Sequence, residues 1–295
     1  MSDLRQQTDC PRLVSSPPRV RDRWNSPRRS PAGGLSGIAG TIKTVVIPRL
    51  AVAHARPRNV ATDIPVSFDD PALKDAAALA ELMLTGDTDG AGVRVDALRA
   101  HGFALEDIYL QLLAPAAAYL RRLWNADLCG FAEATLALWR LQQLLRRYSV
   151  EFRAESDRAE TGRRALLAPT PLEKHDLGHA MFYLVLISEF FRRDGWEAWI
   201  EPDPKAREFA DVVRQEWFDV VEFLVSGDKQ LDALASRIRM VRRESQNRSI
   251  GVMVCGQVFI EHPELVLLVG ADLTATDARQ GAVQAQQLVG LASCS

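Results

Sequence analysis

The spacing of apolar residues changes character at about residue 160 of this 295-residue chain. Before that point, apolar positions recur every three or four residues, which is typical of amphipathic helices. The pattern predicts helices over about 71–84, over a short stretch ending at Gly102, over 105–123 with a kink at Pro115, and from 131 to about 145. Four helices with short connections predict an up-down bundle.

After residue 160, short apolar runs alternate with helical patterns. The runs cover 165–169, 196–200, 219–225, 251–256 and 271–275, and helices fit near 177–193, 205–216, 229–246, 263–268 and 278–290. Strands that alternate with helices predict parallel strands joined by helical crossovers. The expected fold is therefore α/β: an N-terminal four-helix bundle cap followed by a five-stranded, doubly wound parallel sheet of flavodoxin-like type.

The pattern also predicts how the chain is divided. Residues 1–34 are dominated by Pro, Ser and Arg and cannot build a core, so we expect a disordered basic tail. Residues 35–68 are expected to form a helix and a linker. The helical cap is expected over 69–155, and the sheet domain over 160–292.

Composition narrows the location and the partners. No apolar run reaches the roughly 20 residues that a membrane span needs, and the four cysteines are too scattered to form a metal knuckle. We therefore expect a cytoplasmic protein. Residues 1–60 carry a net charge of +8 and the remainder about −10. Such a tail either contacts DNA non-specifically, meets an acidic partner, or is a solvated tail without a partner.

The strongest chemical signal is Glu173-x-His175-x-x-Gly178, in the loop after the first predicted strand. Glu173 is placed to accept a hydrogen bond from one nitrogen of His175, which orients the ring and raises the basicity of the other nitrogen. Gly178 lets a bulky group approach the start of the following helix. The loop lies where doubly wound sheets bind ligands. We therefore expect a cofactor at this sheet edge, with His175 as a metal ligand.

A zinc pair of His175 with His179 is the alternative at this site. It is disfavoured because no Glu stands between the two histidines and no further ligand has suitable spacing. We expect His179 on the surface of its helix.

A helical cap before a five-stranded domain with this motif resembles the cobalamin-binding module. The resemblance implies a cobalamin-binding domain at 160–292, with His175 replacing the cofactor's own base on cobalt, Glu173 orienting it, and the nucleotide tail lying beside the sheet. Some residues depart from the family pattern. Leu224 occupies the slot of a serine that binds the tail, with Ser226 two residues later, and Cys255-Gly256 stands for Gly-Gly.

The resemblance also implies residues over the upper face of the cofactor. Light-sensing members of the family carry Trp, a spacer and then Glu-His; here Trp124 is followed by Glu133 and Ala134. Trp124 is therefore a candidate for the corrin face, with the alternative that it fills the core of the bundle. Phe131 and Trp139 are expected in the core.

Four segments resemble one subgroup, the photosynthesis-regulating antirepressors of purple bacteria. They are 47–50, 105–124, 131–145 and 163–181. The resemblance implies a light- or redox-responsive regulator without enzyme activity that binds a DNA-binding transcriptional repressor of photosynthesis genes. The implied cofactor is cobalamin, in its adenosyl or hydroxo form. Two alternatives remain open: a heme-binding sensor on the same scaffold, and a corrinoid carrier module that serves a separate methyltransferase.

Overall fold

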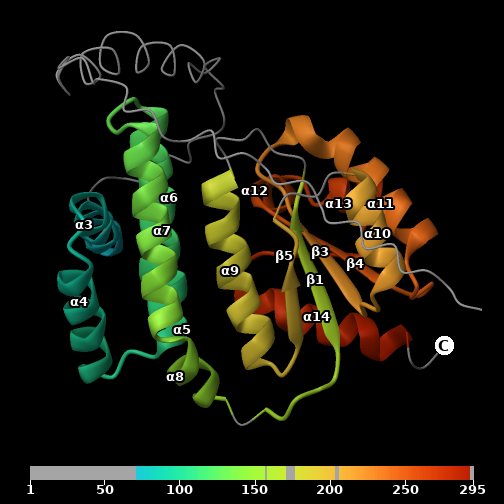
Figure 1. The fold of residues 1–295 in the computed structure, drawn as a ribbon, viewed down its shortest axis with the longest axis horizontal. Coiled ribbons are helices and arrows are strands. Elements are labelled where there is room, and N and C mark those ends of the chain that lie inside the picture. Colours follow the sequence, from blue (N-terminus) through green and yellow to red (C-terminus); the bar gives the residue numbers. More distant parts are fainter. Residues whose placement is uncertain (1–70, 157, 171–176, 203–205, 293–295) are drawn as a thin grey trace, which may run out of the picture. The chain divides into compact units, whose positions relative to one another are not determined.

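The first part of the chain that the structure describes is helical. The structure, a computed structural model, describes residues 71–156, 158–170, 177–202 and 206–292 (Figure 1). The predicted tail (1–34), helix and linker (35–68) therefore lie outside the described residues, and the domain limits stay predictions. The helices of the cap are α3 (Pro71–Thr85), α4 (Thr88–Ala100), α5 (Leu105–Ile108), α6 (Ala114–Asn125), α7 (Phe131–Arg147) and α8 (Ser149–Ala154), with a π-helical turn, η2 (Tyr109–Leu113), between α5 and α6.

The kink expected at Pro115 takes the form of this π-helical turn. Pro115 is the second residue of α6 and has no N–H to donate to the carbonyl of Gln111 one turn earlier. The wider turn of η2 comes directly before it, as π-type turns do where regular helical hydrogen bonding is interrupted. The helix predicted over 105–123 is therefore one continuous element in three segments.

The C-terminal part is a five-stranded parallel sheet with the strand order β2-β1-β3-β4-β5, which confirms the predicted fold class. Its strands are β1 (Arg164–Pro169), β2 (Glu197–Ile200), β3 (Val220–Leu224), β4 (Gly251–Cys255) and β5 (Leu273–Ala275). In the central register, Leu167 of β1 pairs with Glu222 of β3, which pairs with Met253 of β4. Four of the five strands lie within the predicted apolar runs, and β1 begins one residue before its run, at Arg164.

Helices cover both faces of the sheet. The first face packs against α9 (Leu177–Arg193) and α14 (Ala278–Ala292), and its core continues into the helical cap. The second face packs against α10 (Ala206–Gln215), α11 (Leu231–Glu244), α12 (Gln257–Glu261) and α13 (Glu264–Val269). A short 3-10 turn, η4 (Asp228–Gln230), precedes α11.

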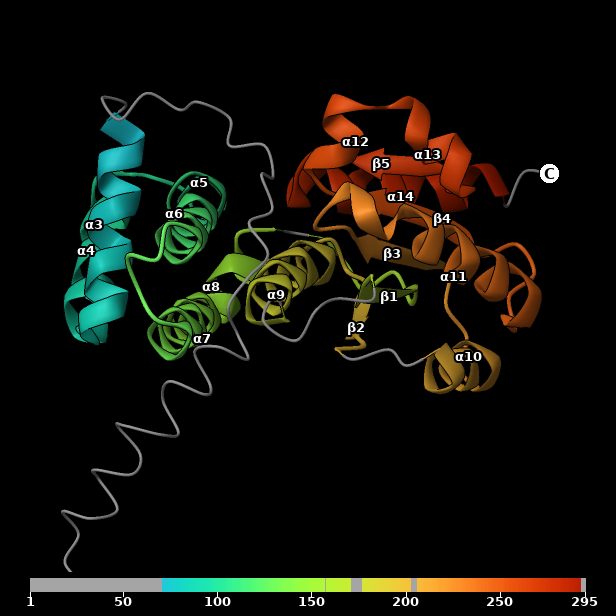
Figure 2. The ribbon, with the colours of Figure 1, turned by 90° about the horizontal axis from the view of Figure 1, so that it is seen from above.

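Helix α9 joins the cap to the sheet. It contacts α6, α7 and α8 on one side and β1, β2 and α14 on the other, and it lies between them in both views (Figures 1 and 2). Phe182, Leu184 and Phe190 of α9 are all buried, because apolar elements pack against this helix from opposite sides. None of the described helices is long and apolar enough to cross a membrane.

The orientation of α7 corrects part of the sequence interpretation. Leu138, Leu141 and Leu145 are buried, whereas Trp139 is 55% exposed and Phe131 39% exposed. The expectation that Phe131 and Trp139 fill the core is therefore wrong. The buried stripe of α7 is set by the positions that face α3, α6 and α9, and Trp139 falls on the opposite side of the helix.

Candidate functional site at the carboxyl edge of the sheet

The carboxyl ends of β1 and β3 meet at the point where the strand order reverses. From β1 the chain continues to β2 on one side, and from β3 to β4 on the other, and folds of this kind bind ligands at such a point. Thr170, the residue after β1, links the ends of β1 and β3 at this point. Its N–H donates to the Leu224 carbonyl oxygen (3.0 Å), and its hydroxyl donates to the same oxygen (3.3 Å) and to Gln230.

The predicted cobalt ligand and its partner fall between β1 and α9 in the sequence. Glu173 and His175 belong to residues 171–176, outside the described residues, so their roles stay predictions. Gly178 is described and is the second residue of α9. A Cβ atom added there would lie 3.6 Å from Leu138 of α7, which is an ordinary contact. The protein fold alone therefore does not require glycine at 178, and its predicted role toward a ligand stays a prediction.

The end of β3 carries Leu224 where the family resemblance expects serine. Leu224 is half-buried and packs against the core shared with α9 and α14, and it pairs with Pro169 and Cys255 in the sheet. Ser226 follows beyond the last strand residue and is also half-buried. The structure thus places an apolar side chain at the end of β3, on the face that α9 and α14 cover, and the Ser226 hydroxyl outside the strand.

Cys255 ends β4 beside Leu224, and Gly256 follows it before α12. Gly256 has a φ of +142°, and a Cβ atom there would lie 2.2 Å from the Val225 carbonyl oxygen, so this position needs glycine. Cys255 is buried, and its thiol lies 3.7 Å from the Phe223 carbonyl oxygen. Burial raises the pKa of the Cys255 thiol well above its ordinary value, and the nearby Glu222 raises it further. Cys255 is therefore a neutral thiol that fills space.

Glu222 is the polar residue of this region that the sequence interpretation missed. It is the third residue of β3, is 1% exposed, and its Oε2 has no hydrogen-bond partner among the described residues. Burial raises the pKa of Glu222 to about 7, while a hydrogen bond from Cys255 acts in the opposite direction. The sequence signal was a single carboxylate within the apolar run Val-Val-Glu-Phe-Leu.

Trp124 and Glu133 lie at the adjoining ends of α6 and α7. The rings of Trp124 and Phe131 are 6.2 Å apart between centroids, and the Trp124 side chain is half-buried. The Glu133 carboxylate accepts a hydrogen bond from the Gly130 N–H at 2.7 Å and so caps the start of α7. This capping role accounts for Glu133 within the protein, and a role of either residue over a cofactor stays a prediction.

His179 is not on the helix surface, which corrects the sequence interpretation. It is buried, and its Nε2 lies 2.6 Å from the Ala117 carbonyl oxygen of α6. One turn along α9, the Tyr183 hydroxyl donates to the Ala114 carbonyl oxygen at 3.2 Å. These bonds attach the first half of α9 to the cap. Among the residues that the structure describes, no group of three or more His, Cys, Asp or Glu side chains is arranged to hold a metal ion.

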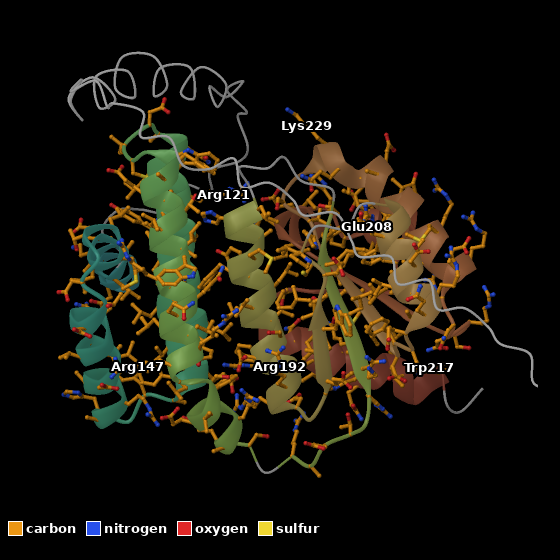
Figure 3. The ribbon with its side chains drawn as sticks, in the orientation of Figure 1. Arg121, Arg147, Arg192, Glu208, Trp217 and Lys229 are labelled. Atoms are coloured by element: carbon orange, nitrogen blue, oxygen red, sulfur yellow. The ribbon has the colours of Figure 1, made fainter. Side chains whose placement is uncertain are left out.

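Basic side chains occur at both ends of the molecule (Figure 3). Arg121 of α6 and Lys229 of η4 lie toward the end that holds the carboxyl edge, while Arg147 of α7 and Arg192 of α9 lie toward the opposite end. The carboxyl edge is therefore flanked by cationic residues from both the cap and the sheet domain.

Comparison with known proteins agrees with this architecture. No family model matches the chain. The chain is a distant homologue of an uncharacterized 20.5 kDa protein of the bchF-crtJ intergenic region of Rhodobacter capsulatus, with 25% identity over 182 residues, covering 62% of this chain and 92% of the relative.

Among solved structures, the Methanosarcina barkeri monomethylamine corrinoid protein superposes with a TM-score of 0.55. The identity is 14%, and the match covers 73% of this chain and 98% of that protein. A cobalamin-binding protein from Desulfitobacterium hafniense is also similar, at 18% identity with a TM-score of 0.37 and the same coverage. The chain thus has the fold of a corrinoid protein, a helical region followed by a five-stranded sheet.

Proposed function

We propose that this protein binds cobalamin at the carboxyl edge of the sheet and acts as a light- or redox-responsive antirepressor of photosynthesis genes. The observation that carries the cofactor assignment is the fold. The sheet order 2-1-3-4-5 with a helical region on α9 matches a corrinoid protein over nearly all of that protein's length. In the sequence, the Glu173-x-His175-x-x-Gly178 motif follows β1, the strand at which the order of the sheet reverses.

The described residues fit such an occupant. Glu222 has a buried oxygen without a partner among them, and Gly256 brings the backbone to the edge without a side chain. His175 would hold the cobalt of the cofactor, and Glu173 would accept the hydrogen bond of the other ring nitrogen. Bound cobalamin would supply a cobalt–ligand bond that responds to light or to oxidation state. The protein's part is to position His175 and to connect its loop to the rest of the fold.

That connection supports the regulatory half of the proposal. The loop that carries His175 leads directly into α9, and α9 contacts three helices of the cap. A change in how the loop is held would therefore alter the packing of the cap, where a repressor would bind.

A heme-binding sensor is the second candidate, favoured by one specific observation. Leu224 and Cys255 place apolar bulk where the resemblance expects groups that accommodate the nucleotide tail, and heme has no such tail. A single histidine also suffices as a proximal heme ligand.

One set of visible spectra tests these proposals. The apoprotein is incubated separately with hydroxocobalamin, adenosylcobalamin and heme, freed of excess ligand, and measured in the dark and after illumination. We expect retention of cobalamin and a band shift that is lost in His175→Ala. His179→Gln is the matched control, because His179 bonds to the cap and should leave the spectrum unchanged. Retention of heme alone, or a cobalamin spectrum unaffected by His175→Ala, would overturn the assignment.

The regulatory part needs a separate measurement. The cobalamin-loaded protein is added to a complex of the photosynthesis-gene repressor and its operator DNA. We expect release of the DNA by one illumination state of the loaded protein and none by His175→Ala. If the loaded protein instead transfers a methyl group from methylcobalamin to a partner enzyme and leaves the repressor bound, it is a corrinoid carrier.

A further inference from the structure

Small side chains line the sheet face under the start of α14. Ala275 ends β5, and Ala278, Gly281, Ala282 and Ala285 lie along α14; all five are buried. A Cβ atom added to Gly281 would lie 3.4 Å from Oε2 and 3.5 Å from Oε1 of Glu222. The residue of α14 that lies against the buried Glu222 carboxyl group is therefore a glycine.

The carboxyl group has an unmet hydrogen-bonding capacity. Oε2 of Glu222 is buried without a partner among the described residues, although buried polar atoms are nearly always hydrogen-bonded in native proteins. An apolar residue at this position would not carry that cost, so a partner that binds there is the best explanation for a glutamate. The unpaired oxygen faces the small residues of α14.

The position of Glu222 relates it to the edge of the sheet. Residues two apart on a strand share a face, so Glu222 lies on the same face as Leu224, about 6.6 Å further from the carboxyl end. Gly281 lies in the first turn of α14, which follows directly after the carboxyl end of β5. The Glu222 carboxyl group thus lies two strand residues away from Leu224, which ends β3 at the sheet edge where the cofactor is proposed to bind.

We propose that Glu222 is a specificity-determining residue: as a neutral carboxylic acid, it donates a hydrogen bond to an acceptor atom in the nucleotide tail of the bound cobalamin. It thereby replaces the serine for which this chain has Leu224. The inference rests on the proposed function, because it assigns a residue to the same site. It accounts for three features together: the apolar Leu224, the orphaned oxygen, and the glycine opposite it.

The surroundings of Glu222 favour the neutral acid. Cys255 on β4 is the ionisable group next to it, and burial raises the pKa of that thiol as well. Leu167 on β1 and Gly281 on α14 contribute no ionisable group. The buried ionisable side chains of α9 are engaged elsewhere: His179 bonds to α6, and Glu189 bonds to Ser149 of α8.

Two corrinoids separate this inference from the proposed function. Cobinamide lacks the nucleotide tail, so dissociation constants are measured for cobalamin and cobinamide with the wild type, Glu222→Leu and Glu222→Gln. We expect the ratio of the cobinamide dissociation constant to the cobalamin dissociation constant to be about tenfold larger in the wild type than in Glu222→Leu. One well-formed hydrogen bond is worth about this factor. Glu222→Gln should keep most of the preference, because its amide also donates.

The pH dependence of corrinoid binding is a second test of the inference. Above pH 7 the free carboxyl group must take up a proton to bind, so wild-type affinity for cobalamin should fall up to tenfold per pH unit relative to cobinamide. Calorimetry in buffers of different ionisation enthalpy should show up to one proton taken up. Glu222→Gln should show neither effect, and cobinamide, which shares His175, corrects for other titrations.

Gly281→Ala separates a binding role from a structural one. Alanine is the better helix former, so the apoprotein should become more stable, while the added methyl group beside Oε2 should weaken cobalamin binding and spare cobinamide. Equal preference for the two corrinoids in the wild type and Glu222→Leu overturns the inference but leaves the proposed function intact. If neither corrinoid binds any variant, the proposed function fails, and the inference falls with it.

Discussion

At the scale of the residue, Glu222 makes the stability of the apoprotein depend on pH. Its pKa is raised from 4.5 to about 7 by burial, so between these values the folded state holds a proton that the unfolded state has lost. Stability must therefore fall as pH rises through this window and stay lower above it. We expect a loss of about 3 kcal/mol between pH 4.5 and 8, measured as the free energy of unfolding in urea.

The control for this prediction is Glu222→Gln, which has nearly the same shape and does not ionise. The relevant quantity is the difference between the two proteins at each pH, because other groups titrate equally in both. If the two curves stay parallel from pH 4.5 to 8, the carboxyl group ionises without cost, and it is not buried as the structure shows it.

His179 supplies a second prediction at this scale. Its ring fills a buried site and bonds to the Ala117 carbonyl oxygen, so His179→Ala loses both packing and a hydrogen bond. We expect destabilisation by about 2–4 kcal/mol in urea unfolding. A change below 0.5 kcal/mol would mean that the ring lies on the surface, as the sequence interpretation had it.

The sequence singles out His175 as a candidate but not Glu222, and the difference is physical. A histidine after a buried strand, with a carboxylate two residues before it, is a local pattern. The burial of Glu222 depends on α14, whose Gly281 lies 59 positions further along the chain. The surface position predicted for His179 failed for the same reason, since its partner is on α6.

At the scale of the element, the sequence predicts long helices better than short ones. The helix predicted over 177–193 has the bounds of α9, because its apolar positions extend over nearly five turns. Helices α8 and α12 have six and five residues, too few to show a periodic pattern, and they were not predicted. Helix α8 follows α7 and α12 follows β4, and each short helix is stabilised by packing that continues from the element before it.

The orientation of α7 is testable by paired substitutions. Trp139 is 55% exposed and Leu141 is fully buried, although both are large apolar residues of one helix. We expect Trp139→Lys to change the free energy of unfolding by less than about 0.5 kcal/mol and Leu141→Ala to lower it by about 2–5 kcal/mol. Comparable losses in both variants would place Trp139 in the core after all.

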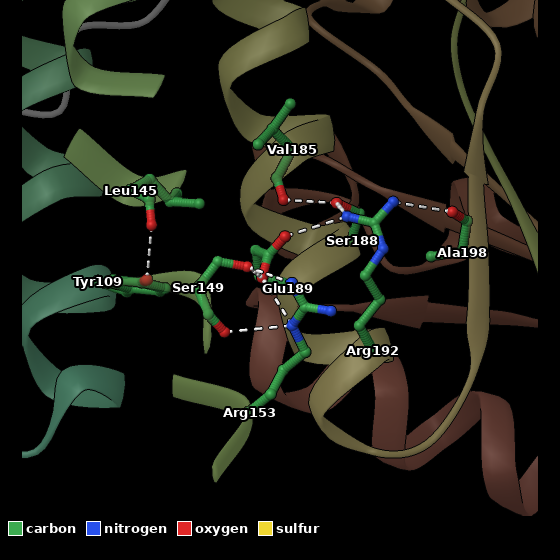
Figure 4. Close-up of polar contacts among 9 residues, drawn as sticks. All are labelled: Tyr109, Leu145, Ser149, Arg153, Val185, Ser188, Glu189, Arg192 and Ala198. Atoms are coloured by element: carbon green, nitrogen blue, oxygen red, sulfur yellow. Dashed lines mark hydrogen bonds and ion pairs between the residues drawn. The ribbon is translucent and has the colours of Figure 1, made fainter. Parts of the chain in front are cut away.

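At the scale of the whole molecule, the cap and the sheet share one core and one buried polar network. The apolar core runs from α3 through α9 to β4 and α14. Beside it, Glu189 of α9 bonds to Ser149 of α8 and pairs with Arg192 at 3.0 Å, and Arg192 donates to the Ala198 carbonyl oxygen of β2 at 3.0 Å (Figure 4). One carboxylate thus links the cap to the edge strand of the sheet.

This sharing argues that the cap and the sheet domain unfold together, although the change in sequence pattern at about residue 160 separates them. The predicted four-helix cap and doubly wound sheet are both present, and α9 belongs to the cores of both. A boundary in the sequence pattern marks a change of secondary structure, and it does not reveal how much apolar area is buried across it.

Removal of Glu189 tests this coupling. Glu189→Ala removes the buried carboxylate that Ser149 and Arg192 share, while Arg192 keeps its hydrogen bonds to Ser188 and Ala198, so we expect a loss of about 1–3 kcal/mol in the free energy of unfolding. Arg279→Ala is the control: it breaks a half-exposed pair with Glu106 of α5, worth about 0–1 kcal/mol. Far-ultraviolet circular dichroism and tryptophan fluorescence should report one coincident transition in the wild type and in both variants. Two separate transitions, with only one shifted by Glu189→Ala, would show that the cap and the sheet are independent folding units.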